Sequence, residues 1–316
     1  IDYSINDLNA PEPRQFHRLA TLYFSNQKLI ALFGGVGILS NLKDHWILDC
    51  NSDNNWKWFQ LLPSNLSAAI PRARNAHTFN NLWDNTFDTE FVLLYGGVNT
   101  DVTDEYLEDT WLGRYKYNDA INAPVPITFE WTQLNTSTNT PGKRAYHAAG
   151  TMGNGTGIFL FGGWDGESYL DDAWYFEATS DTWKSLTMVA SDPSVQNFVK
   201  MAGVSDLSMT SLDKGQFFIL GGETSGYHWL EFSYYLKVDL VLNTVVASRI
   251  VSNLNPPPRA DAKIQSYGDG KILLFGGQFF NEKTFGDVSS FIFFHLYFFI
   301  YIFTDDDFMY FSSFFF

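Results

Sequence analysis

Residues 144–186 read RAYHAAGTMGNGTGIFLFGGWDGESYLDDAWYFEATSDTWKSL, and this stretch decides the fold. It contains four short segments rich in apolar and aromatic residues, separated by glycine, asparagine, serine and aspartate. Segments that are too short for a helix and are bounded by turn residues are typical of β-strands. The stretch therefore predicts four consecutive strands, and no segment of the chain shows a sustained helical period.

An apolar run that ends in a pair of glycines recurs along the chain. The runs LIALFGG, FVLLYGG, GIFLFGG, QFFILGG and KILLFGG place their first glycines 62, 66, 59 and 55 residues apart. Paired glycines at the end of a strand permit positive φ angles and a close approach of neighbouring backbones. We therefore interpret the pairs as a backbone requirement of the repeat and not as a phosphate-binding loop: Gly34, Gly35, Gly96, Gly97, Gly162, Gly163, Gly221, Gly222, Gly276 and Gly277.

Other residues keep a constant phase with the glycines. An Arg-x-x-His motif lies about twenty residues before each of the first three pairs, and two tryptophans follow each of these pairs, the first usually beside an aspartate. Each repeat is thus expected to hold an Arg-x-x-His strand, a glycine-pair strand and two tryptophan strands. The fourth repeat lacks the motif and both tryptophans, and Ala262 replaces the histidine in the fifth. We assign to this structural pattern His17, His77, His147, Trp46, Trp56, Trp111, Trp131, Trp174 and Trp183.

A single four-stranded sheet cannot cover its own faces, so the repeats must stack, and radial stacking gives a β-propeller. On the motifs above, the chain resembles the kelch-repeat β-propeller family over residues 10–290. The resemblance implies an all-β fold of four-stranded antiparallel blades, of which about five are present. Because kelch domains usually close with six or seven blades, we expect a fragment of such a ring. The alternative is that the terminal strands close a five-bladed ring.

The expected propeller occupies residues 1–290, with repeat units at about 11–62, 63–134, 135–190, 191–254 and 255–290. Residues 291–316 form a phenylalanine-rich tail without repeat residues or strand alternation, and we expect it to lie outside the native fold. The alternative is a membrane helix at 291–303, but these thirteen residues include His295 and are shorter than the roughly 17 to 25 that a span needs.

The composition narrows the function classes. A formal net charge of -15 disfavours binding to nucleic acid, since a phosphate backbone would be repelled. The single cysteine, Cys50, cannot form an intramolecular disulfide, and this favours a reducing compartment such as the cytoplasm. The chain has no catalytic motif, so we expect no enzymatic activity, no cofactor and no metal. We expect no membrane partner either, and the oligomeric state stays open.

Two sets of residues are candidates for binding a partner protein or peptide. Arg14, Arg74, Arg144 and Arg259 share one repeat position, and Arg72 lies beside the second of them. The resemblance to kelch substrate adaptors implies that arginines at this position hold acidic peptides. The alternative is that each arginine pairs with groups inside the fold.

The second set lies in the loops after the glycine pairs, which differ from repeat to repeat. Their candidate contact residues are Trp164, Asp165, Tyr169, Tyr227 and Trp229. The same loops are acidic, which favours a basic partner. The sequence thus predicts a non-catalytic protein-interaction module, a scaffold or adaptor. The alternative is a propeller enzyme or metal-dependent specifier that acts on a small molecule at the top face.

Overall fold

A computed structural model of the chain describes residues 10–24, 27–51, 56–62, 69–82, 89–101, 103–117, 127–135, 139–153, 155–191, 193–195, 203–225, 228–230, 233–250, 256–267, 271–279, 283–284, 288–294 and 297–303. In these residues the regular structure is β-strand, apart from one 3₁₀ turn at Pro193–Val195. No helix in this part of the chain is long and apolar enough to cross a membrane.

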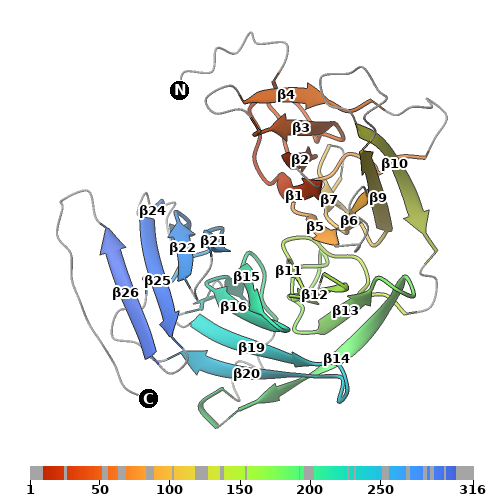
Figure 1. Ribbon diagram of the computed structural model, residues 1–316. Helices are drawn as coiled ribbons and strands as arrows, with labels where there is room; N and C mark the ends of the chain where they lie inside the picture. The colour runs from red at the N-terminus through yellow and green to blue at the C-terminus, as the bar shows by residue number, and fades with distance from the viewer. Residues whose placement is uncertain are drawn as a thin grey trace. The chain divides into compact units, whose positions relative to one another are not determined.

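The strands form antiparallel four-stranded sheets, one for each repeat, in the order that the sequence predicts (Figure 1). This confirms the expected all-β architecture. In chain order the strands of the five sheets are β1 (Arg18–Phe24), β2 (Gln27–Phe33), β3 (His45–Asp49) and β4 (Lys57–Gln60); β5 (Thr78–Leu82), β6 (Thr89–Tyr95), β9 (Thr110–Tyr117) and β10 (Ile127–Leu134); β11 (Ala148–Thr151), β12 (Gly157–Phe161), β13 (Ala173–Glu177) and β14 (Thr182–Ala190); β15 (Ser208–Asp213), β16 (Gln216–Leu220), β19 (Ser233–Asp239) and β20 (Thr244–Ile250); and β21 (Lys263–Ser266), β22 (Lys271–Phe275), β25 (Val288–Phe294) and β26 (Tyr297–Phe303).

A short antiparallel pairing follows every glycine pair. In the first and third repeats it is a single bridge, Val36 with Asn41 and Trp164 with Tyr169. In the other repeats it is a small hairpin, formed by β7 (Val98–Asn99) and β8 (Glu105–Tyr106), by β17 (Glu223–Thr224) and β18 (His228–Trp229), and by β23 (Gln278–Phe279) and β24 (Lys283–Thr284). The loops that the sequence marks as variable therefore start from a common backbone framework.

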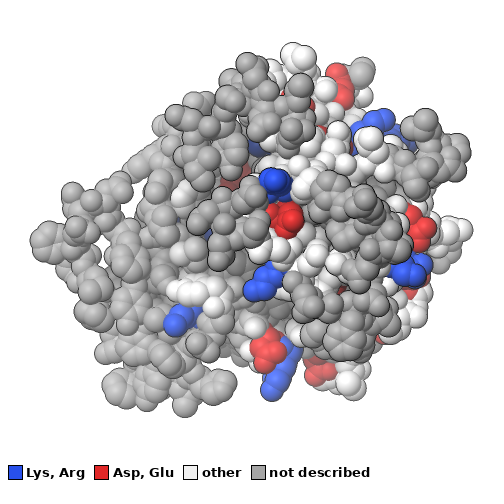
Figure 2. Space-filling model, turned by 45° about the horizontal axis from the view of Figure 1, so that its top comes forward, with Lys and Arg blue, Asp and Glu red and all other residues white. Residues whose placement is uncertain are grey.

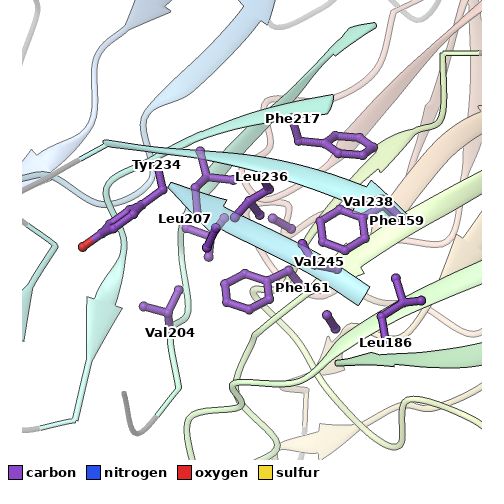
Figure 3. Close-up of a cluster of buried hydrophobic side chains, with 14 of the residues drawn as sticks. Phe159, Phe161, Leu186, Val204, Leu207, Phe217, Tyr234, Leu236, Val238 and Val245 are labelled. Atoms are coloured by element: carbon purple, nitrogen blue, oxygen red, sulfur yellow. The ribbon is translucent and has the colours of Figure 1, made fainter. Parts of the chain in front are cut away.

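The chain divides into two compact units, each with an apolar core of its own. One unit comprises Ile1–Ala145, Asn154–Ile158 and Phe176–Lys184, and the other comprises Tyr146–Gly153, Phe159–Tyr175 and Ser185–Phe316. In the first unit, Phe33 of β2 packs against Phe79 of β5 with ring centroids 6.2 Å apart. Figure 3 shows the main cluster of the second unit, where the ring centroids of Phe159 and Phe217 are 4.9 Å apart.

In the first four repeats the glycine-pair strands are largely buried on both faces, as the apolar runs predict, and every residue of β12 is buried. The strand β22 of the fifth repeat differs, because Leu273 and Phe275 on one of its faces are exposed, Phe275 at 58%. In each of the other four repeats the residue just before the glycine pair is buried, namely Phe33, Tyr95, Phe161 and Leu220. One face of β22 therefore lacks the cover that the glycine-pair strands of the other repeats have.

Both glycines of every pair have positive φ angles, between 62° and 110°, in agreement with the expected backbone requirement. Space is restricted as well: a Cβ atom added to Gly97 would lie 2.7 Å from the Asn75 carbonyl oxygen and 2.8 Å from the His77 Cβ. In the first four repeats, the amide of the second glycine donates to a carbonyl of the following repeat, as Gly35 does to Arg74 at 2.9 Å. Each pair thus allows the backbones of successive repeats to bond directly.

A non-glycine residue with positive φ occurs two positions after the arginine of the Arg-x-x-His motif. The backbones of some of these residues are hydrogen-bonded to one another in successive repeats. Asp206 N donates to Tyr146 O at 2.9 Å, and Asp261 N donates to Asp206 O at 3.1 Å. In the fourth repeat, residues 204–207 therefore take the place of Arg-x-x-His, although the sequence motif is lost. The residues with this conformation are Phe16, Ala76, Tyr146, Asp206 and Asp261, with φ of 50° to 59°.

One strand pairing has no counterpart in the sequence pattern. The end of β14 runs parallel to β20, with Thr187 opposite Thr244 and Ala190 opposite Ala247, and the third and fourth sheets join into an 8-stranded sheet. Figure 1 shows these two long strands side by side. The pairing covers the backbone edge of β20, which would otherwise be open to another strand.

The second-tryptophan strand of the first repeat was expected at Trp56, but Trp58 lies opposite Leu48 just as Trp131 lies opposite Gly113, and Trp56 is 64% exposed. Trp58 is thus the true equivalent, and the neighbouring tryptophan misled the alignment. In the tail, β25 pairs with both β22 and β26, so strands exist where the sequence shows no alternation. The repeat boundaries, and a tail outside the native fold, stay predictions.

Candidate functional site

Arg74 is completely buried, and its guanidinium group makes a forked salt bridge. Its Nη1 and Nη2 atoms donate to Oδ1 and Oδ2 of Asp109 at 2.6 and 2.7 Å, and Nη1 also donates to the Gly96 carbonyl at 2.9 Å. Trp111 Nε1 donates to the same carboxylate at 2.6 Å. The pair of Arg74 and Asp109 therefore links the arginine loop, the glycine-pair strand and the first-tryptophan strand of one repeat.

The same arrangement recurs in the first repeat. Arg14 donates to both oxygens of Asp44 at 2.6 and 2.7 Å and to the Gly34 carbonyl at 3.1 Å, while Trp46 Nε1 donates to Asp44 at 2.6 Å. In the third repeat, Trp174 Nε1 donates to Asp172 at 2.6 Å. The aspartate two residues before the first tryptophan is thus a structural member of the repeat. The residue pattern places an aspartate beside the first tryptophan, but this aspartate was not among the predicted site residues.

The other predicted arginines are also turned inward. Arg144 is buried and donates to the Pro141 carbonyl, and Arg259 is buried and donates to the Gly276 carbonyl at 2.8 Å. Among the five candidate arginines, Arg72 alone has a largely exposed side chain, and it pairs with Glu105 at 2.5 Å. These contacts favour the structural interpretation of the arginines, because an acidic peptide needs guanidinium donors that it can reach.

The salt bridge also sets the ionisation of its carboxylate. Burial by itself would raise the pKa of Asp109, but the hydrogen bonds from Arg74 and Trp111 and the positive charge of Arg74 outweigh burial and lower it. The pKa of Asp44 is lowered in the same way by Arg14 and Trp46. Both carboxylates are therefore held in the charged form that the arginines require.

The repeated histidines of the first two repeats, His17 and His77, pack against the glycine pairs. His77 and His147 are buried, His17 is partly buried, and the His77 Cβ occupies the space beside Gly97. Among the described residues, no group of three histidine, cysteine or acidic side chains has an arrangement that could hold a metal ion. Packing is thus the role that the contacts of these histidines support.

A fourth histidine, His45, forms a buried polar contact that sequence reasoning missed. Its Nε2 lies 2.7 Å from the hydroxyl oxygen of Tyr115, and its ring contacts Phe129 with centroids 4.3 Å apart. Burial lowers the pKa of His45 to about 3 and raises that of Tyr115 well above its ordinary value. Both groups are neutral at neutral pH, so this pair fixes a core contact.

The loop after the third glycine pair holds three candidate residues in one turn. The rings of Trp164 and Tyr169 meet edge to face with centroids 4.7 Å apart. Asp165 Oδ1 accepts hydrogen bonds from the amides of Glu167 and Ser168, both at 2.7 Å. The carboxylate fixes the turn, and the aromatic pair is only partly buried. The structure therefore brings these residues together as one ordered element.

This turn is linked to the loop of the fourth repeat. The Tyr169 hydroxyl donates to Glu223 Oε1 at 2.9 Å, and Trp229 lies opposite Glu223 in the β17–β18 hairpin. Trp229 is partly buried, and Tyr227 lies outside the described residues. Four of the five loop candidates thus belong to two adjoining, hydrogen-bonded loops.

A carboxyl pair lies close to the same loops and was not predicted. Burial, the charge of Asp261 and the charge of Glu223 together raise the pKa of Asp206 to about 7. Ser205 Oγ donates to Asp206 Oδ2 at 2.6 Å, and Gln278 Nε2 donates to Asp261 Oδ2 at 2.7 Å. The sequence contained no signal for this pair, because the fourth and fifth repeats diverge at these positions.

Charged groups are interspersed on the face shown in Figure 2. Basic and acidic side chains lie directly beside one another at several places on its described surface. On the described part of this face, the lysine and arginine side chains do not gather into one continuous patch.

Comparison with known proteins identifies the family of proteins to which the chain is similar. The sequence matches the KLHDC2/KLHL20/DRC7 Kelch-repeats domain over residues 5–207 and 118–295. It is 27% identical over 185 residues to the flagellar outer arm dynein alpha chain of Chlamydomonas reinhardtii, covering 56% of this chain and 4% of the dynein. It is 28% identical over 188 residues to Adagio-like protein 1 of Oryza sativa subsp. japonica, covering 59% of this chain and 26% of that protein.

The chain therefore belongs to the family of Kelch-repeat domains, and its fold class is the all-β, kelch-type propeller. Domains of this family are generally protein-interaction modules. The chain spans about a quarter of the length of the Adagio-like protein and a far smaller share of the dynein.

Proposed function

We propose that the chain is a non-catalytic scaffold or adaptor that binds a partner protein through the loops after its glycine pairs. The observation that carries the proposal is that the repeated polar residues are committed to the fold, as in the salt bridge between Arg74 and Asp109. The loops, by contrast, differ in sequence and lie on a common framework. Variable loops on a rigid scaffold are the usual place for binding residues.

The partner is expected to present a basic surface. The loops carry Asp101, Asp104, Glu105 and Glu108 in the second repeat and Asp165 and Glu167 in the third. The arginines that would have attracted an acidic peptide are buried or paired. Charge complementarity therefore supports a basic partner, and the chain's net charge of -15 acts in the same direction.

Selection of peptides from a phage-displayed random library on the purified chain tests this proposal. We expect the selected peptides to be basic, and the Trp164→Ala variant to weaken their binding about tenfold, because an aromatic anchor is lost. The Trp56→Ala variant is the matched control, since Trp56 is exposed but lies outside the loops. Binding that no loop variant weakens, while circular dichroism shows folded protein, would refute the proposal.

The propeller enzyme or metal-dependent specifier stays the alternative; among the described residues, no group of three histidine, cysteine or acidic side chains could hold a metal ion for it. The cytoplasmic location and the lack of a nucleic-acid partner stay predictions from Cys50 and from the net charge.

A further inference from the structure

The loop of the first repeat exposes two neighbouring aliphatic side chains. Ile38 is 70% exposed and Leu39 is 96% exposed. Single exposed apolar residues are normal on a protein surface, but adjacent ones on an ordered turn need a separate explanation. The turn between β19 and β20 carries the comparable residues Val241 and Leu242.

Hydrogen bonds hold this loop in one backbone conformation. Val36 and Gln15 exchange bonds, with Val36 N to Gln15 O at 2.8 Å and Gln15 N to Val36 O at 3.0 Å, and Gly37 N donates to Ser40 O at 3.0 Å. Asn41 is buried and its Nδ2 donates to Asp101 Oδ1 at 2.7 Å. Ile38 and Leu39 thus stand at the tip of a turn that is fixed before any partner binds, which lowers the entropy cost of binding.

Carboxylates flank the two aliphatic side chains. A Cβ atom added to Gly37 would lie 2.7 Å from Glu12 Oε1, so the Glu12 carboxylate rests against the turn. On the side of the second repeat, Asp101 accepts the Asn41 bonds and is itself exposed. Lys43 is the exposed cation at the end of this loop, and Arg72 is already paired with Glu105. The apolar tip therefore has a predominantly acidic border.

We propose, building on the function proposed above, that the turn formed by Ile38 and Leu39 is a contact site for a basic amphipathic segment of the partner protein. Apolar side chains of the segment pack on Ile38 and Leu39, and its lysines or arginines pair with Glu12 and Asp101. Acidic segments are excluded because they would bring like charges together at this border.

The probes are two fluorescein-labelled 18-residue amphipathic helical peptides. Both have the same leucine residues on the apolar face, and the polar face consists of lysine in one peptide and of glutamate in the other. Their binding to the whole chain is measured by fluorescence anisotropy at physiological salt. We expect the Leu/Lys peptide to bind at least about tenfold more tightly than the Leu/Glu peptide. The Ile38→Ser/Leu39→Ser variant should weaken the Leu/Lys peptide about tenfold, and Glu12→Gln should weaken it by about two- to fivefold.

The control is the Val241→Ser/Leu242→Ser variant, which removes similarly exposed side chains from another turn and should change the affinity less than twofold. Equal binding of the Leu/Lys peptide to the wild type and to Ile38→Ser/Leu39→Ser would overturn the inference, since it would show diffuse attraction to an acidic protein. If phage-selected peptides nevertheless respond to Trp164→Ala, the proposed function stands and this inference alone fails. If no loop variant changes any binding, both fail.

Discussion

Replacing Arg74 by alanine should be among the most damaging single substitutions in the chain. The variant loses the two bonds to Asp109 at 2.6 and 2.7 Å and the bond to the Gly96 carbonyl at 2.9 Å. It also leaves a carboxylate with only 19% of its side chain exposed and without its cation. Removing one partner of a buried ion pair costs about 3–5 kcal/mol. We expect Arg74→Ala to lower the free energy of unfolding by about 3 kcal/mol, at the lower end of this range, because water still reaches part of Asp109.

The chain offers a matched control two residues away. Arg72 pairs with Glu105 at 2.5 Å, a distance similar to that of the buried pair, but its side chain is 63% exposed. An exposed ion pair contributes about 0–1 kcal/mol. Arg72→Ala and Arg74→Ala remove the same charge, so a difference in their free energies of unfolding isolates the effect of burial.

Urea unfolding followed by circular dichroism measures both variants, and the pH dependence gives a second test. In the wild type the pKa of Asp109 lies below its ordinary value, so this carboxylate stabilises the fold above pH 3.8 and the stabilisation is lost as the pH falls through the folded-state pKa. Arg74→Ala should weaken that acid dependence. The reasoning is refuted if the two variants cost the same, or if Arg74→Ala costs less than about 1 kcal/mol.

Three further predictions concern the backbone and two buried titratable groups. Gly97→Ala should lower the free energy of unfolding by several kcal/mol, because the new Cβ would lie 2.7 Å from the Asn75 carbonyl oxygen. Gly142 also has a positive φ, of 78°, but open space around it, so Gly142→Ala should lower the free energy by only about 1–2 kcal/mol. Thermal unfolding measures both variants. Burial lowers the pKa of His45 to about 3, so between pH 6.5 and 4.5 the unfolded state takes up a proton that the folded state does not. The free energy of unfolding of the wild type should therefore fall by roughly 2–3 kcal/mol over this range. In urea titrations, His45→Phe should remove this fall. Burial and the charges of Asp261 and Glu223 raise the pKa of Asp206 to about 7, so its contribution to the free energy of unfolding is complete below pH 3.8 and declines as the pH rises towards the folded-state pKa. Asp206→Asn should lack this decline, and a parallel pH profile of variant and wild type would contradict the assignment.

The backbone of the repeat was the most predictable part of the structure. A glycine pair after an apolar run restricts the possibilities strongly, since few backbone conformations need two successive positive φ angles. The period then places every other strand relative to the pair. The register of one strand was wrong, because Trp56 and Trp58 both satisfy the composition of the pattern and only the pairing of Trp58 with Leu48 distinguishes them.

The candidate site was less predictable because direction and distance are absent from the sequence. Arg74 finds its carboxylate 35 residues later, at Asp109, so a recurring arginine indicates a binding ring and a buried ion pair equally well. The parallel pairing of β14 with β20 depends on the length of one strand and leaves no trace in the residue pattern. Sequence reasoning therefore identified the repeat but not which of its polar residues reach solvent.

The fourth repeat separates what the fold requires from what it merely tends to use. Residues 204–207 contain neither arginine nor histidine, yet Asp206 has the same positive φ angle as Phe16 and Ala76 in the first two repeats. A left-handed conformation costs a non-glycine residue about 1–2 kcal/mol, so the surrounding hydrogen bonds must impose it. Because the backbone enforces this position without regard to its side chain, an aromatic ring, a methyl group and a carboxylate can all occupy it. Chemical variety at such positions leaves the backbone conformation unchanged, and differences in binding between repeats can arise there and in the loops while the scaffold stays constant.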